Sequence, residues 1–177
     1  MRAWPKRPEV AFAARFLAVS VPLSVLYAYP RGDGALHAAI HAYLALYARV
    51  AGAAIGWFDP SVRVVDTQIL GQYALQIVKN CDAMDLQILL LSAIFALPVR
   101  LGWRVIGSAA GFMLLSLGNV TRIVSLYFIG VHAPSEFELA HREWWPLALV
   151  LWALGAFLMF VRLTREAAAA SSLRKLP

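Results

Sequence analysis

The chain changes character within residues 80–97, which read NCDAMDLQILLLSAIFAL. A polar, strand-like segment ends here, and an apolar helix is expected from Leu86 to Leu97. Asp82 is placed to cap the N-terminus of that helix, with Asp85 in its first turn. Cys81 is the only cysteine among 177 residues. An internal disulfide is therefore excluded, and the thiol is either reactive or an inert buried group.

Composition places the chain in a membrane. Hydrophobic residues make up 61% of it and charged residues 15%, against about 45–50% and about 25% in soluble domains. The net charge of +6 comes from Lys and Arg beside apolar runs, without a basic run interleaved with aromatic residues. This pattern does not indicate nucleic-acid binding. We expect an all-α polytopic membrane protein that forms one integral membrane domain.

Apolar runs of helical pattern predict four transmembrane helices, and the charged segments between them set the limits of each region. The first span, 11–29, has the length of a membrane crossing, although a cleaved signal peptide is the alternative. Residues 1–10 form a basic cytoplasmic head, and residues 164–177 form a loose cytoplasmic tail. The other three spans belong to a core at 82–163: Leu86–Leu97, Val105–Val131 and Trp145–Val161.

The region 30–81 is expected to lie outside the cytoplasm. Ala35 to Phe58 is helical in pattern, but His37, His41 and Arg49 share one broad face, which is typical of a helix lying in the membrane surface. The spacing of His37 and His41 also suits two metal ligands on one helical turn. No third ligand is evident in the sequence, so a polar helix face is the simpler interpretation.

Two segments rich in β-branched residues follow this helix. They are Val62–Leu70 and Tyr73–Val78, and Gly71-Gln72 between them predicts a β-hairpin turn. Open strand edges cannot face lipid, because their backbone groups would lack hydrogen-bond partners. The hairpin is therefore expected in water or among the headgroups, directly before Cys81.

The distribution of charge supports an N-terminus inside the cell. With four spans, the inner side carries +8 and the outer side −2, as the positive-inside rule requires. This topology places Cys81, Arg122 and His141 toward the outer face. Arg122 lies about 28 Å along a helix from Trp103, near the outer hydrocarbon boundary. The inner Lys and Arg residues are Arg2, Lys6, Arg7, Arg15, Arg100, Arg104, Arg162, Arg165, Arg174 and Lys175.

Three residue types at one membrane depth suggest acyl-transfer chemistry. Arg122 is flanked by apolar residues, and an arginine at membrane depth marks a functional site unless it snorkels to the interface. Cys81 offers a nucleophile, His141 a proton-transfer group and Arg122 a permanent positive charge for an oxyanion. Inert alternatives exist for each residue alone: a buried thiol, a snorkelling arginine and a polar loop histidine.

Three motifs carry a resemblance to a known family. They are Val78–Met84, Asn119–Leu126 and Phe137–His141, and together they resemble the exosortase/archaeosortase family of multi-pass membrane transpeptidases. The resemblance covers roughly Asp59 to Leu163. Many members carry Gly two residues after the cysteine, where this sequence has Ala83.

The resemblance implies a catalytic triad of Cys81, Arg122 and His141. Its implied partners are the lipid bilayer and the C-terminal sorting tails of exported proteins, each with a short motif, an apolar helix and a basic end. Cleavage would occur at the outer face of the cytoplasmic membrane through a thioacyl-enzyme, without a metal or organic cofactor, and the acceptor is unknown. Three further residues are candidates for binding substrate or supporting the triad: Asn119, Asp82 and Glu138.

Two rival functions remain open from the sequence. The chain could be a non-enzymatic scaffold or a subunit of an envelope-assembly or transport complex. This alternative accounts for the spans but not for a Cys, an Arg and a His at one depth. A metal site is the second rival, and it would draw on His37, His41, His132 and His141.

Overall fold

The protein is helical and polytopic in the computed structural model, which describes residues 7–28, 34–79 and 83–173. Four helical segments are long and apolar enough to cross a membrane. They are α1 (Pro8–Ala28), α2 (Ala35–Gly56), α4 (Leu101–His132) and the run Pro134–Ala170, which contains most of α6 (Trp145–Leu173). The expected multi-pass, mainly α-helical membrane protein is thereby confirmed.

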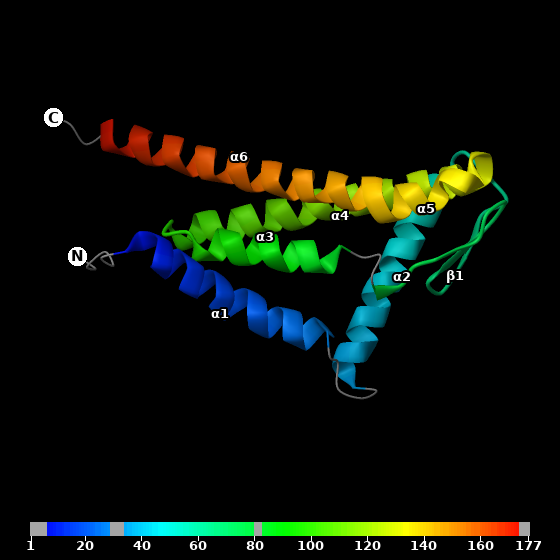
Figure 1. Ribbon diagram of the computed structural model, residues 1–177, viewed down its shortest axis with the longest axis horizontal. Helices are drawn as coiled ribbons and strands as arrows, with labels where there is room; N and C mark the ends of the chain where they lie inside the picture. Colours follow the sequence, from blue (N-terminus) through cyan, green and yellow to red (C-terminus); the bar gives the residue numbers. More distant parts are fainter. Residues whose placement is uncertain (1–6, 29–33, 80–82, 174–177) are drawn as a thin grey trace.

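The helices differ in direction (Figure 1). Helices α1, α3 (Met84–Ala96), α4 and α6 run along the length of the molecule, whereas α2 crosses them steeply near one end. Helix α3 packs against α1, α4 and α6 and so occupies the middle of the bundle. The start of α1 and the end of α6 lie at the same end of the molecule, opposite α2.

The number of candidate spans agrees with expectation, but length and composition select α2 where the sequence analysis selected α3. Helix α2 has the length and apolar character of a span, whereas α3 has only 13 residues. Thirteen residues rise about 20 Å, which is less than the roughly 30 Å hydrocarbon core. Two helices are also longer than expected, because α4 begins at Leu101 and α6 extends through the tail to Leu173. The Ala-rich tail sequence favours this helical continuation.

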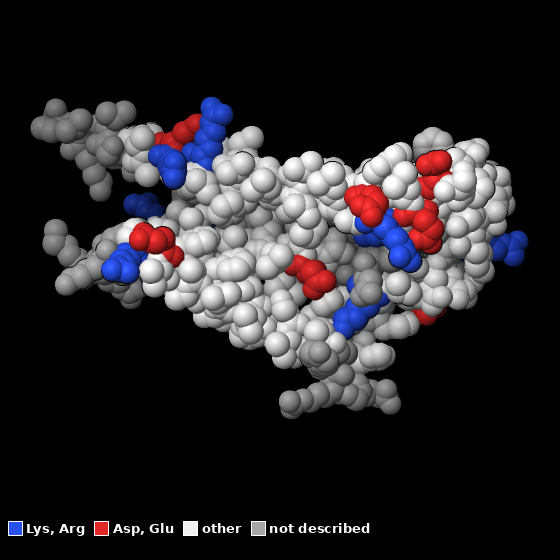
Figure 2. Space-filling view, in the orientation of Figure 1, with Lys and Arg blue, Asp and Glu red and all other residues white. Residues whose placement is uncertain are grey.

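Charged side chains collect at the two ends of the molecule. Figure 2 shows Lys, Arg, Asp and Glu around the end where α1 begins and α6 finishes, and again around the end that carries α5 (Phe137–Leu139) and the sheet. The surface between them is mostly uncharged in this view. An apolar band between two charged ends is the arrangement that a bilayer requires.

The expected hairpin is a three-stranded antiparallel sheet. Strands β1 (Arg63–Val65), β2 (Gln68–Leu70) and β3 (Leu75–Gln76) pair in the order β1-β2-β3. The first expected strand is split by a turn, in which Asp66 has a φ of 57°. Asp tolerates this left-handed conformation better than most residues. Strand β3 pairs with β2 on one side, and its other edge has no strand partner among the described residues.

The start of α3 differs from the capping prediction. The N-cap residue is Ala83 rather than Asp82, and its side chain offers no capping hydrogen bond. Ala83 has φ 56° and ψ 17°, a left-handed conformation that favours glycine. Asp82 itself lies outside the described residues, as do Asn80 and Cys81.

The segment expected to be a loop before the last span is helical. A 3-10 turn (Pro134–Glu136), α5 and a π-helical turn (Ala140–Trp144) lead without a break into α6. Pro134 is well placed for this start, because the first turn of a helix does not use its backbone N–H. His141 therefore lies on a π-helical turn, a feature often found at functional sites.

Two apolar clusters hold the elements together. One joins α2, the sheet and the C-terminal half of α4, and it includes Ile55, Ile69 and Tyr127, each fully buried. The other joins α3, α4 and α6 through Ile94, Leu115 and Phe160. The first cluster fixes the sheet against α4, and this contact positions the candidate site described next.

Candidate active site

Arg122 is buried in the C-terminal half of α4. Its residue exposure is 6%, and its neighbours Ile123 and Leu126 on the same helix are also buried. An arginine at membrane depth costs at least about 2.5–3.5 kcal/mol to insert. A position this enclosed is not that of an arginine whose charged end snorkels freely to the interface. The burial therefore favours a functional role.

His141 is held by aromatic contacts. Its ring stacks on Phe137 with centroids 5.7 Å apart and an interplanar angle of 26°. Phe137 in turn contacts Tyr73, just before β3, with centroids 5.4 Å apart. The half-buried histidine is thus fixed between the π-helical turn and the sheet. Such fixed orientation is what a proton-transfer group needs.

Arg122 and His141 line one pocket of about 290 Å³. They come from different elements, α4 and the turn before α6, and the structure brings them together as the sequence analysis expected. The third wall is the continuous segment Tyr73–Val78, which contains β3. The pocket therefore combines a buried cation, an imidazole and a strand that, among the described residues, pairs on one side only.

Cys81 lies outside the described residues. Val78, three residues before it in the sequence, lines the pocket that contains Arg122 and His141. Lys79 is anchored beside α1, where its Nζ lies 3.1 Å from the Ala28 carbonyl oxygen and its own carbonyl accepts from Tyr27 at 3.0 Å. The strand that leads to Cys81 is thus fixed at both α1 and the pocket.

Asn119 lies one helical turn before Arg122 and is completely buried. Neither its Oδ1 nor its Nδ2 has a hydrogen-bond partner within the described residues. A buried amide without partners costs about 1–3 kcal/mol by protein mutational data. Such a residue calls for an explanation, and a role toward substrate beside Arg122 is one that agrees with the sequence analysis.

A second polar cluster fixes the sheet, and the sequence analysis missed it. Tyr127 donates to Asp59, and the same hydroxyl accepts from the Gln72 amide at 2.9 Å. Ser61 also donates to Asp59, from its hydroxyl at 2.6 Å and its amide at 3.0 Å. Hydrogen bonds from Ser61 and then from Tyr127 hold the pKa of Asp59 at about 2, below its usual 3.8. The cluster ties the start of the sheet and the turn before β3 to α4.

A third polar cluster lies between α2 and the bundle. The Gln87 amide accepts from Tyr43 at 2.8 Å and donates to Ser116 at 3.1 Å and to Tyr47 at 3.3 Å. Gln87 is 1% exposed, so its hydrogen bonds replace those that water would make. The cluster docks α2 onto α3 and α4 and supports the fold around the site. Its only sequence signal was a glutamine within an apolar helix.

The remaining candidates have other contacts. Glu138 accepts from the Arg142 guanidinium at 2.7 Å, and both side chains are exposed. His41 contacts Asp66 at 3.1 Å, whereas His37 is exposed on α2. Within the described ranges, no group of three or more His, Cys, Asp or Glu side chains could hold a metal ion.

Comparisons with protein-family models, with curated proteins and with solved structures found no match to this chain. Functional inference therefore rests on the motifs in the sequence and on the pocket that contains Arg122 and His141.

Proposed function

We propose that the chain is a membrane cysteine transpeptidase of the exosortase/archaeosortase type, which cleaves C-terminal sorting tails of exported proteins. One observation carries the proposal. Arg122 and His141, which come from separate elements, line a single pocket with the strand that leads to Cys81. A scaffold protein has no need to bury an arginine beside a histidine at membrane depth.

The three side chains have complementary roles. The Cys81 thiolate attacks a peptide carbonyl of the substrate, and Arg122 stabilises the oxyanion that forms. The C–N bond then breaks, His141 gives its proton to the leaving amine, and a thioester joins the substrate to Cys81. An acceptor nucleophile or water attacks this thioester and releases the thiolate. No metal or organic cofactor is required for these steps.

The edge of β3 provides a way to hold the substrate. Ile77 donates to the Thr67 carbonyl at 2.9 Å, so the backbone groups of the neighbouring residue Gln76 point to the other edge of the strand. An extended substrate segment would pair there and lie along the pocket beside Arg122 and His141. Substrates N-methylated at alternate amides test this arrangement. One set of positions should lose cleavage while the other retains it, and equal cleavage of both sets would contradict the pairing.

The direction of the helices supports one arrangement in the membrane. We place α1, α3, α4 and α6 across the membrane, with α2 in the interface and the sheet outside the cytoplasm. Helix α2 runs across the others and exposes its polar residues His37, His41 and Arg49 (Figure 1). Helix α3 is about 10 Å shorter than the hydrocarbon core. With its C-terminal end at the inner boundary, α3 begins below the outer surface and leaves room for a recessed site.

Processing of a co-expressed substrate tests the proposal. The substrate carries a C-terminal motif, an apolar helix and a basic end and comes from the same genome. Loss of its tail is measured by mass, together with a thioester-sensitive adduct. Cys81→Ala should abolish processing. Arg122→Gln should slow it about 10²–10³-fold and His141→Gln about 10²–10⁴-fold.

Matched variants separate chemistry from folding. Arg142→Gln removes an exposed arginine near the site, and His132→Gln removes an exposed histidine that stacks on Phe128. Both should process the substrate at nearly the wild-type rate. Processing that persists in Cys81→Ala would exclude the thiol from the reaction and favour a scaffold.

A further inference from the structure

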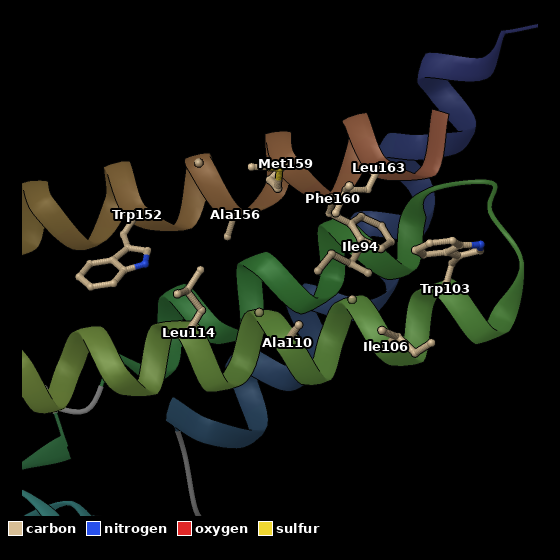
Figure 3. Close-up of a pocket in the computed structure, with 13 residues that line it drawn as sticks. Ile94, Trp103, Ile106, Ala110, Leu114, Trp152, Ala156, Met159, Phe160 and Leu163 are labelled. Carbon is tan, nitrogen blue, oxygen red and sulfur yellow. The ribbon is translucent and has the colours of Figure 1, made fainter. Parts of the chain in front are cut away.

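An apolar groove of about 450 Å³ lies between α4 and α6, at a distance from the candidate active site. Figure 3 shows that the groove runs between the two helices, with Trp103 at the end near the α3–α4 loop and Trp152 toward the other end. From Trp103 to Leu114, its α4 wall extends about 17 Å along the helix axis. Small residues, among them Gly155 and Ala156, leave the space open on the α6 side.

The groove continues into a second pocket of different character. This pocket, about 310 Å³, shares Trp103 with the groove and is also lined by Arg100 and Thr164. Arg104 follows one helical turn after Arg100, and its Nε is buried without a hydrogen-bond partner in the part of the chain that the structure describes. The apolar groove therefore ends beside Arg100, and Arg104 lies one helical turn further along α4, outside the lining of both pockets.

This end of the molecule carries excess positive charge. Among its described residues, Arg162 is paired with Glu166 at 2.9 Å, whereas neither Arg100 nor Arg104 forms a salt bridge. Figure 2 shows basic side chains, with acidic ones beside them, where α1 begins and α6 finishes. The two arginines therefore supply a positive charge that no described carboxylate balances.

We propose that the groove and the adjoining pocket bind one anionic phospholipid. An acyl chain lies in the groove against the Gly155 side, and the phosphate headgroup contacts Arg100 and Arg104. Basic pockets between transmembrane helices recognise anionic headgroups in this way, with about 1 kcal/mol for each basic residue near the surface. A zwitterionic lipid would fill the groove but gain no net attraction to the two arginines. Free phosphate would bind the arginines without filling the groove.

Native mass spectrometry of the full chain in detergent tests the headgroup. Phosphatidylglycerol and phosphatidylcholine with identical acyl chains compete for the protein. The wild type should prefer phosphatidylglycerol at least about 5-fold, the equivalent of one such contact. The variant Arg100→Gln/Arg104→Gln should lose this preference, whereas the matched variant Arg162→Gln/Arg165→Gln, which removes two charges outside both pockets, should keep it.

A second pair of variants tests the groove without changing charge. A Cβ added at Gly155 meets no atom within 4 Å, so Gly155→Leu should fill the groove and leave the helices in place. We expect it to weaken phosphatidylglycerol binding at least about 5-fold. This loss is reached when one or two methylenes of the acyl chain are no longer buried in the groove. Gly56→Leu also adds a side chain in open space, but at the far end of α2, and should bind as the wild type does.

Four results would overturn the proposal. The first is equal affinity of the wild type for the two lipids. The second is an unchanged preference in the Arg100→Gln/Arg104→Gln protein. The third is unchanged binding in the Gly155→Leu protein. The fourth is complete displacement of phosphatidylglycerol by millimolar inorganic phosphate, which would indicate a free-anion site instead.

Discussion

Replacing Asn119 with leucine should make the protein more stable and less active at the same time. The side chain is completely buried in α4, and both of its polar atoms lack partners within the described residues. Leucine has the same number of side-chain heavy atoms as asparagine, branched at the same carbon, and brings no polar group. The change therefore removes the cost of a buried amide without opening a large cavity.

The size of the effect follows from that cost. An unpaired amide in an apolar environment destabilises a protein by about 1–3 kcal/mol. Asn119→Leu should therefore raise the free energy of unfolding by about 1–3 kcal/mol. Asn119→Ala removes the same amide but leaves a cavity, which costs about 2 kcal/mol or more in a packed core. The alanine variant should therefore gain less than the leucine variant or lose stability.

Reversible unfolding in mixed micelles measures these differences, and the processing assay measures activity on the same preparations. Ser92→Ala is the matched control, because Ser92 is also fully buried and its Oγ has no described partner. It should gain about 1 kcal/mol or more and retain processing, since Ser92 lies on α3 away from the pocket. Asn119→Leu should lose processing at least about 10-fold, the effect of one lost hydrogen bond to a substrate.

A less stable Asn119→Leu protein would refute the reasoning, because the amide would then have a stabilising partner in the protein without substrate. An Asn119→Leu protein that is more stable and fully active would contradict the proposed role toward substrate. That result would remove Asn119 from the site and leave it as a residue without a function in catalysis.

Three further predictions follow from the backbone and the hydrogen bonds. Ala83→Gly should raise the free energy of unfolding by about 1 kcal/mol in the same assay, because Ala83 has a left-handed conformation that glycine adopts freely; an unchanged or lower value would contradict this. Tyr127→Phe should destabilise the fold near neutral pH. The pKa of its carboxylate partner is lowered in the folded state, so that stabilisation is complete above pH 3.8 and is lost toward about 2, and the deficit of the variant should shrink across that range. A deficit independent of pH would rule out this cause. A Cβ at Gly130 would overlap the Tyr73 ring, so Gly130→Ala should slow processing at least about 10-fold, whereas Gly102→Ala, in open space, should not; equal rates would show that the ring adapts.

Local signals in the sequence were sufficient for much of the fold. Hydropathy and length revealed the polytopic class, because an apolar run must either cross the membrane or lie in it. Hydropathy and length did not decide whether α2 or α3 crosses the membrane. Length alone favours α2, whereas the direction of α2 across the bundle depends on tertiary packing, which the sequence does not reveal. The sheet was expected as one hairpin because its first turn consists of Asp66-Thr67, without the glycine that usually marks such a turn.

The candidate site was predictable only in part. Arg122 and His141 were recognised from residue type and expected depth, and they line one pocket. The contacts that position the pocket were not visible in the sequence. Tyr127 and Asp59 are 68 residues apart, and the pairing depends on how α4 meets the sheet. The stack of His141 on Phe137 likewise requires a helical turn where the sequence suggested a loop.

The reactivity of the single thiol tests the central claim most directly, because the chain has one cysteine and the measurement needs no knowledge of the substrate. A polar alkylating reagent added to the purified protein near neutral pH should modify Cys81 rapidly. Arg122→Gln should slow the reaction at least about 10-fold by withdrawing a positive charge from the thiolate. His141→Gln should slow it at least about 10-fold by removing the base that accepts the thiol proton, while His132→Gln should not. Slow modification at the same rate in all four proteins would contradict a thiol active site formed by Cys81, Arg122 and His141.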